Sequence, residues 1–298
     1  MRKSTAPDLT SDARSVSTSG MWPFHVRLGP FAVTPVELFV LLGVALATAL
    51  ARRRMAAIGL TWTQLFDTAL GGLVGGAVGS KLFHAVPLWI RGAESAGATL
   101  SAWSDGSSIV GGWLGGTLAS VFVARLKGFP GLAVMDAGAP GLPAGFAVGK
   151  IGCFIAGCCY GVRTDGPLGV SFARGSLAYK AQSLPLGAER ALPVHPVMLY
   201  ELVLGVALCL ALTWFYPRRR RAGEPYVAFI AGYAFWRFAI EFMRDDPGRR
   251  NFGVAALSDQ QIAALVLIAA SAVAWFLLPN QSPSNDPASV PPSPADKS

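Results

Sequence analysis

The sequence predicts an all-α, polytopic integral membrane protein with seven transmembrane helices. Of its 298 residues, 52% are hydrophobic and only 14% are charged, whereas a soluble domain carries roughly 25% charged residues. The apolar residues come in blocks of about 20, the length that a helix needs to cross a bilayer. The 34 glycines suit helices that pack closely in lipid. This composition excludes a disordered chain and a disulfide-stabilised secreted mini-protein.

Seven apolar stretches define the expected helices, and two polar tails flank them. Pro140 and Pro143 interrupt the fourth stretch, because proline disturbs a regular helix. Residues 1–22 lack the apolar core of a signal peptide, and residues 280–298 are rich in Pro, Ser and Asp. Both are expected to be disordered tails on a membrane domain at 23–279. The expected spans cover residues 31–51, 66–86, 109–124, 131–160, 197–216, 226–243 and 261–278.

The net charge of +8 is better explained by membrane topology than by nucleic-acid binding. Arginine runs at 52–54 and 218–221 directly follow apolar blocks, and Arg125 with Lys127 follows a third. Cytoplasmic loops of membrane proteins collect such basic residues. The pattern therefore predicts an N-terminus outside the plasma membrane, a cytoplasmic C-terminus, and external loops at 87–108 and 162–195.

The sixth span carries three polar side chains on one helical face. Tyr233, Arg237 and Glu241 are spaced four residues apart, so a helix places them in line. Charged residues inside a membrane span are energetically expensive and mark functional sites. Arg237 is therefore a candidate to bind an anionic phosphate, with the Tyr233 hydroxyl beside it. Two structural alternatives remain, an internal Arg237–Glu241 ion pair and an arginine that snorkels to the membrane interface.

The motif His195-Pro196-Val-Met-Leu-Tyr200-Glu201 leads into the fifth span. Proline is favoured in the first turn of a helix, which puts His195 at the outer membrane interface. A single interfacial histidine is structural or catalytic, and the sequence leaves both roles open. Glu201 enters the apolar region, where a carboxylate needs a partner.

Three of the four cysteines lie together at the end of the fourth span, in the segment G-K-I-G-C-F-I-A-G-C-C-Y-G. Its glycines permit close approach of a backbone or a lipid headgroup. Cys153, Cys158 and Cys159 admit three roles: packing residues, a metal site, or thiols made reactive by the nearby Lys150. The spacing C-x4-C-C is not that of a zinc ribbon, so no metal site is predicted. On a regular helix Cys153 and Cys158 would lie about 140° apart around the axis.

Together, these motifs resemble the bacterial prolipoprotein diacylglyceryl transferase family. The likeness runs from about residue 24 to residue 278. The segment 195–201 matches the family motif H-P-x-x-L-Y-E, and the segment 233–244 matches Y-x-x-x-R followed by E-F-x-R. The segment 149–161 is similar to the family's G-R-x-G-N-F-x-N-x-E region. Asp136, with Ala139-Pro140, matches the family at the start of the fourth span.

The resemblance implies a seven-helix enzyme of the bacterial plasma membrane that needs no cofactor. Such an enzyme moves a diacylglyceryl group from phosphatidylglycerol to the lipobox cysteine of a prolipoprotein. The phospholipid, the signal peptide of the prolipoprotein and the bilayer are the implied partners, with no nucleic acid. The implied catalytic residues are Arg237, Tyr233 and His195. The implied substrate-binding residues are Lys150, Cys153, Cys158, Gly161, Tyr200, Glu201, Glu241 and Arg244.

The chain departs from the family pattern at several pocket positions. Lys150 stands where the family has Arg, Cys153 and Ala156 where it has Asn, and Cys158 where it has Glu. Val110 replaces the family's His before a glycine pair. The general base is thus unassigned, and three alternatives stay open: lipid transfer to a different acceptor, an inactive lipid-binding or helper protein, and a thiol-dependent membrane protein.

Overall fold

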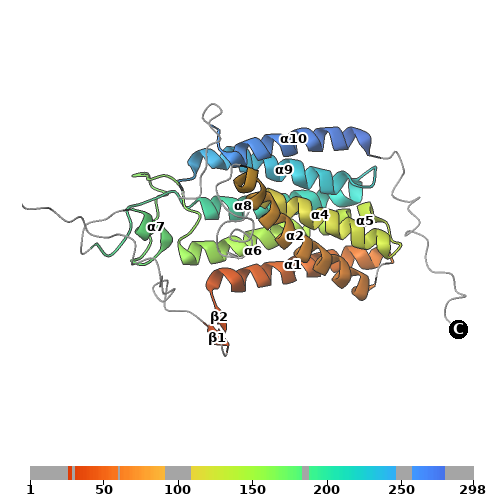
Figure 1. Ribbon diagram of the computed structural model, residues 1–298, viewed down its shortest axis with the longest axis horizontal. Helices are drawn as coiled ribbons and strands as arrows, with labels where there is room; N and C mark the ends of the chain where they lie inside the picture. The colour runs from red at the N-terminus through yellow and green to blue at the C-terminus, as the bar shows by residue number, and fades with distance from the viewer. Residues whose placement is uncertain are drawn as a thin grey trace, which may run out of the picture.

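The computed structural model describes residues 26–28, 31–59, 61–90, 109–182, 188–245 and 257–278. Its long helices lie roughly side by side as a bundle (Figure 1). The helices are α1 (Pro35–Ala57), α2 (Trp62–Ile90), α4 (Ile109–Leu126), α5 (Gly131–Gly138), α6 (Gly141–Ala156), α7 (Leu177–Ala181), α8 (Val197–Phe215), α9 (Glu224–Ile240) and α10 (Asp259–Leu277), with the 3-10 helices η1 (Tyr216–Arg218) and η2 (Glu241–Met243).

The predicted all-α class is confirmed, and each of the seven apolar stretches contains a helix. Within the described ranges, four segments are long and apolar enough to cross a membrane: 35–57, 197–218, 224–243 and 260–277. Helices α5 and α6 together make a fifth candidate, bent by 42° between them. The bend lies where Pro140 and Pro143 interrupt the apolar stretch, because proline removes helical hydrogen bonds.

Two features were not predicted. A small antiparallel hairpin, β1 (Val26–Leu28) and β2 (Phe31–Val33), precedes α1. The fourth stretch was expected to be apolar and helical as far as residue 160, but α6 ends at Ala156. The expected tails at 1–22 and 280–298 lie outside the described residues.

Large apolar side chains cover the outside of the bundle, as a lipid environment requires. Leu41 is 64% exposed on α1, Val203 65% on α8 and Phe276 82% on α10. A water-soluble protein rarely exposes contiguous apolar surface on this scale. The exposed faces are therefore lipid-facing surfaces of a multi-pass membrane protein.

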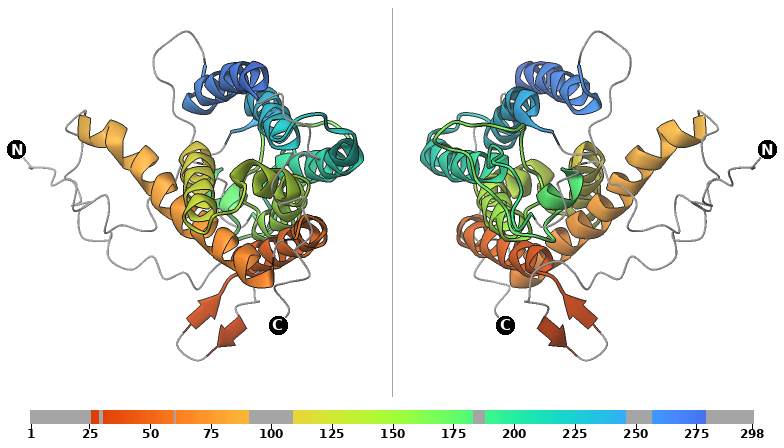
Figure 2. Two further views of the ribbon diagram at one scale, coloured as in Figure 1. Left: turned by 90° about the vertical axis from the view of Figure 1, so that its right-hand side faces the viewer. Right: turned by 90° about the vertical axis from the view of Figure 1, so that its left-hand side faces the viewer.

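Glycines let neighbouring helices approach until their backbones touch. A Cβ atom on Gly75 of α2 would lie 2.5 Å from the carbonyl oxygen of Gly115 on α4, and one on Gly145 of α6 would lie 2.6 Å from that of Gly43 on α1. Small residues at contact points are the usual means by which helices associate in lipid. Viewed along the bundle, α2 slants outward while α1, α6, α8, α9 and α10 follow one another in a curved row (Figure 2).

A buried carboxylate fixes the start of α9. The Asp136 carboxylate, on α5, accepts hydrogen bonds from the backbone N–H groups of Gly223 at 2.7 Å and Tyr226 at 3.2 Å. A negative charge is favourable at a helix N-terminus, where N–H groups lack helical partners. This anchor fixes the first turn of the helix that carries Tyr233 and Arg237.

The segment between α6 and α8 folds over one end of the bundle, where Figure 1 shows it around α7. It has its own apolar cluster, which includes Tyr160, Phe172 and Val194. Isolated bridges pair Val170 with Val194 and Ala173 with Arg190. The predicted external loop is therefore a packed cap, and the residues expected to carry the chemistry lie at this end.

Candidate functional site

A buried ionic cluster lies where α6, α8, α9 and η2 meet. We define it as Lys150, Glu201, Arg237, Glu241 and Arg244, each at most 9% exposed. All five are residues that the sequence predicted for the site, and the structure brings them together through a chain of ion pairs. Buried charges strongly destabilise a protein unless they are paired, so each member of the cluster depends on its ion-pair partners.

Glu201 has the partner that its apolar surroundings demanded. Its Oε2 lies 2.6 Å from Lys150 Nζ on α6 and 3.8 Å from Arg244 Nη1. Glu201 lies one turn into α8, which begins directly after Pro196. Lys150 also lies over the Phe146 ring, with Nζ 4.8 Å from the ring centroid. Two neighbouring helices are thus joined by a buried ion pair.

The ion pair that the sequence left open as a structural alternative forms between α9 and η2. Arg237 Nη1 lies 2.7 Å from Glu241 Oε2, and Arg244 Nε lies 4.0 Å from the same oxygen. The other Glu241 oxygen accepts a hydrogen bond from Ser258 Oγ at 2.8 Å. A guanidinium has five N–H donors, so one contact with Glu241 orients Arg237 and leaves capacity for an anionic ligand.

Tyr233 lies on the same α9 face, and its hydroxyl is the notable polar group of this site. Its side chain is 5% exposed and packs edge-on against Trp113 and Phe146, with ring centroids 5.9 and 5.7 Å away. The buried hydroxyl proton has no acceptor among the described residues. An unsatisfied buried donor destabilises a protein by about 1–3 kcal/mol. A ligand oxygen that accepts this hydrogen bond would remove that cost.

His195 belongs to a neighbouring backbone junction. Its half-buried ring places Nδ1 3.1 Å from Tyr200 Oη. The Gly161 N–H donates to the His195 carbonyl at 2.8 Å, and Gly161 pairs with Arg244 in an isolated bridge. A Cβ on Gly161 would lie 3.0 Å from the His195 Cβ. Gly161 is thus a backbone packing position, and its backbone links His195 to the segment that carries Arg244.

The three clustered cysteines converge because α6 stops earlier than its apolar pattern predicts. Gly157 adopts a left-handed φ of 65°, and its N–H bonds the Phe154 carbonyl. The Cys158 N–H then reaches back to the Cys153 carbonyl at 3.1 Å. These two bonds form a Schellman motif, which closes a helix and reverses the chain. The separation of about 140° between Cys153 and Cys158 applies only to a regular helix, and α6 ends before Cys158.

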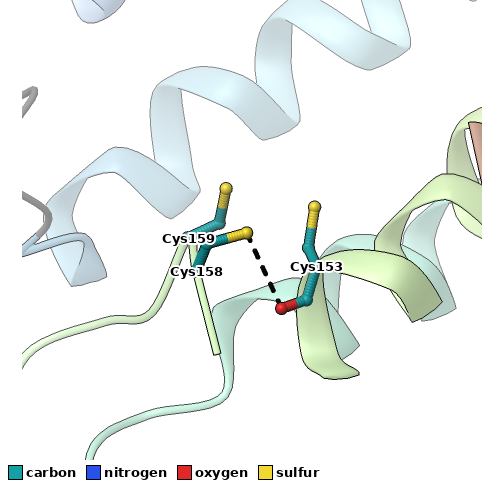
Figure 3. A group of neighbouring side chains, drawn as sticks. All are labelled: Cys153, Cys158 and Cys159. Atoms are coloured by element: carbon teal, nitrogen blue, oxygen red, sulfur yellow. Dashed lines mark hydrogen bonds between the residues drawn. The ribbon is translucent and has the colours of Figure 1, made fainter. Parts of the chain in front are cut away.

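In the cysteine cluster, which we define as Cys153, Cys158 and Cys159, the Cys158 thiol points toward Cys153 and donates to its carbonyl oxygen at 3.7 Å (Figure 3). All three sulfur atoms lie within 4.8 Å of one another, and all three residues are free thiols. The pKa of the Cys159 thiol lies below its ordinary value, first because the Cys153 and Cys158 thiols are placed to hydrogen-bond its sulfur, and further because Lys150 and Arg244 are near. Burial of Cys159 opposes this shift.

The sequence analysis did not assign roles to three residues that the structure places at the site. Ser258 binds Glu241 and also caps α10 in a capping box with Gln261. Its signal was the S-x-x-Q pattern at the start of the last span. Trp113 contacts Tyr233, and nothing in its local sequence marked it. Cys159 was noted in the cluster but was not assigned to a site.

Known proteins of one description are similar to this chain over most of its length. The family model described as prolipoprotein diacylglyceryl transferase matches residues 23–277. A phosphatidylglycerol--prolipoprotein diacylglyceryl transferase of Geobacter sulfurreducens is 37% identical over 75% of this chain and 82% of its own length. Proteins with the same description from Azotobacter vinelandii and Vibrio parahaemolyticus are 33% and 31% identical over 85% and 83% of this chain, and over 93% and 86% of their own lengths. The chain therefore belongs to the prolipoprotein diacylglyceryl transferase family.

Proposed function

We propose that this protein transfers a diacylglyceryl group from phosphatidylglycerol to the lipobox cysteine of a prolipoprotein. The observation that carries the proposal is the ionic cluster, because its five residues stand at family motif positions and assemble in one buried place. The names of the relatives support the donor lipid and the acceptor protein. We further propose that the signal peptide of the prolipoprotein presents the acceptor cysteine.

The phospholipid headgroup is proposed to lie between α6 and α9. Arg237 and Lys150 supply positive charge, and the Tyr233 hydroxyl supplies a donor that the described residues leave unmatched. Glu241 and Glu201 hold the two cations in place through contacts of 2.7 and 2.6 Å. Preorganised cations of this kind stabilise the charge that develops on a leaving group. Arg244, Gly161, Cys153 and Cys158 border the same region.

An apolar cavity of 400 Å³ between α1, α2, α4 and α5 suits the acyl chains of the donor. Trp113 is in its wall and also contacts the Tyr233 ring. The cavity therefore reaches Tyr233, which shares the α9 face of Arg237, as the apolar and anionic parts of one phospholipid would require. Ligand sites commonly combine a largely apolar wall with a few polar groups in this way.

In the proposed reaction, the acceptor thiol attacks the glycerol carbon that carries the phosphate oxygen. A carbon–sulfur bond forms, the carbon–oxygen bond breaks, and glycerol phosphate leaves with the electron pair. We propose His195 as the base that receives the thiol proton. If Nδ1 donates to Tyr200 Oη, the lone pair of Nε2 is free to accept that proton.

We also propose that seven spans cross the bilayer within 23–279, with the N-terminus outside and the C-terminus inside. The basic ends of α1 and α8 lie together, because Arg54 Nη2 donates to Thr213 Oγ1 at 3.1 Å. The contact of Lys127 Nζ with Asp67 Oδ2, at 3.1 Å, joins the end of α4 to the start of α2. Reporter fusions at residues 54 and 221 should be cytoplasmic and one at residue 170 external; an external signal at residue 221 contradicts this topology.

Complementation tests the proposed activity. Cells depleted of their own transferase should grow and diacylate a reporter prolipoprotein when they express this chain, and should not when they express Arg237→Ala. Cys209→Ser, a change of a half-buried cysteine on α8 outside the site, is the matched control and should complement. Wild-type protein that reaches the membrane and binds phosphatidylglycerol without diacylating the reporter would support an inactive lipid-binding protein instead.

A further inference from the structure

We propose that Cys153, Cys158 and Cys159 form a binding site for one soft, thiophilic cation of the Zn²⁺ or Cu⁺ class. The proposed transfer reaction does not require these thiols to converge. The inference is therefore independent of the transferase activity. It rests on the geometry of the three sulfur atoms, on the backbone that sets it, and on the charge around them.

The spacing of the sulfur atoms fits a metal with three thiolate ligands. A thiolate ligand lies about 2.3 Å from zinc, so three sulfurs around one ion lie about 4 Å apart. The three Sγ atoms all lie within 4.8 Å of one another. Small side-chain rotations are enough to close this difference. Soft thiolate sets of this kind select Zn²⁺ or Cu⁺ over hard cations such as Mg²⁺ or Ca²⁺.

The backbone is constrained to bring the thiols together. A Cβ on Gly157 would lie 2.8 Å from Ser176 Cβ, so the left-handed turn leaves no room for a larger residue. Cys159 also adopts a positive φ, 57°, which a residue other than glycine rarely does. Such a conformation persists only where the surrounding structure enforces it, and it clusters at functional sites. Here it sets the position of the third thiol.

The surrounding charge favours a bound thiolate set. Binding breaks three S–H bonds, releases three protons to solvent and forms three metal–sulfur bonds, with no change of oxidation state. The product carries one negative charge with Zn²⁺ or two with Cu⁺. Lys150 and Arg244 lie close enough to interact electrostatically with Cys159, and their positive charges offset this negative charge. The cysteines are half-buried, so an ion can reach them.

Metal binding would fasten the end of α6 to the segment that leads into the external cap. Cys153 belongs to the last turn of α6, whereas Cys158 and Cys159 follow the turn at Gly157. One ion would thus connect a membrane helix to the cap next to Lys150. A metal that binds only the folded protein stabilises it by mass action.

The test uses the full chain, purified in detergent micelles with a reductant that does not bind metals. Zn²⁺ and Cu⁺ are titrated separately against a chromogenic chelator, and the metal content per chain is measured after gel filtration. We expect one ion per chain and a higher unfolding temperature for wild type and for Cys209→Ser. Each of Cys153→Ser, Cys158→Ser and Cys159→Ser should weaken binding by about 100-fold or more, since replacing a residue that only hydrogen-bonds a metal ligand already weakens binding by about 10–100-fold.

Circular dichroism confirms that each serine variant keeps its helices before its affinity is compared. Tight binding of either ion supports the site, and the tighter one identifies the metal. The proposal is overturned if neither ion binds the wild type, or if a folded Cys158→Ser protein binds as tightly as wild type. It is also overturned if thiol counting on anaerobically purified, unreduced protein finds a disulfide within the cluster.

Discussion

Replacing Glu201 with glutamine should strongly destabilise the protein, because it leaves a buried lysine without its counter-charge. Glu201→Gln keeps the shape of the side chain and removes its negative charge. Lys150 Nζ, 2.6 Å away, is in a side chain only 11% exposed. At an effective dielectric constant of about 20, two charges at that distance attract each other by about 6 kcal/mol. Breaking a buried pair from one side typically destabilises a protein by about 3–5 kcal/mol.

The assay is reversible unfolding in mixed micelles, followed by circular dichroism. We expect the free energy of unfolding to fall by about 3–5 kcal/mol in Glu201→Gln. The cation–π contact of Lys150 Nζ with the Phe146 ring, at 4.8 Å, is present in both proteins and so does not change this difference. Glu37→Gln is the matched control. Glu37 is exposed in the capping box of α1, where glutamine serves equally well.

A second variant separates charge from packing. Lys150→Met combined with Glu201→Gln removes both charges, and the pair should recover most of the lost stability, since an apolar replacement of a buried ion pair is often neutral. A Glu201→Gln protein within about 1 kcal/mol of wild type would refute the reasoning, because an exposed ion pair is worth no more than that. A double variant less stable than the single one would also refute it.

Three further outcomes follow from the geometry. Arg237→Lys should lose about 2–4 kcal/mol of transition-state stabilisation, because a planar guanidinium with two parallel N–H donors becomes a point charge. Lipid turnover should fall about 30- to 1,000-fold relative to wild type assayed in parallel, and turnover within threefold of wild type would contradict this expectation. Gly157→Ala should destabilise the protein by about 1–2 kcal/mol, because the φ of Gly157 is 65°. Gly149→Ala, measured in the same thermal unfolding experiment, should not destabilise it, because the added Cβ would lie 3.7 Å from its nearest neighbour. Because the pKa of Cys159 is lowered, its thiolate should persist as pH falls, whereas free cysteine has a pKa of about 8.5. The alkylation rate of Cys159, followed by mass spectrometry, should therefore fall less between pH 9 and pH 7 than the rate of free cysteine.

Much of the fold could be predicted because hydropathy reports burial in lipid directly. The apolar stretch at 197–216 corresponds to α8 within one residue, and the stretch at 109–124 to α4 within two. The two prolines marked the bend between α5 and α6. The cap between α6 and α8 was missed because its contacts, such as those within the apolar cluster around Phe172, join residues far apart in sequence. Neither helical period nor strand alternation marks such a segment.

The site was predictable where spacing along one helix decides the geometry. Tyr233, Arg237 and Glu241 share a face of α9 and its 3-10 extension because they are four residues apart. Pairs between helices could not be predicted from the sequence. The sequence indicates that Glu201 needs a partner, but only the fold identifies that partner as Lys150. The cysteine cluster was hidden for a different reason. A left-handed glycine after Ala156 reverses the chain, and glycine is compatible with either outcome.

The pairing of the cations bears on how this chain accommodates lysine where its family has arginine. Lys150 presents one ammonium group, and Glu201 Oε2 already lies 2.6 Å from it. A phosphate oxygen must therefore share that point charge with Glu201. Arg237 contacts Glu241 through a single nitrogen at 2.7 Å, and its fork has further N–H donors. In the proposed reaction, Arg237 would consequently contribute most of the stabilisation of the charge that develops on the departing glycerol phosphate. Lys150→Arg should therefore increase turnover when tested beside wild type, because a second fork would bind both the carboxylate and the phosphate. A decrease in turnover in a folded Lys150→Arg protein would contradict this division of labour.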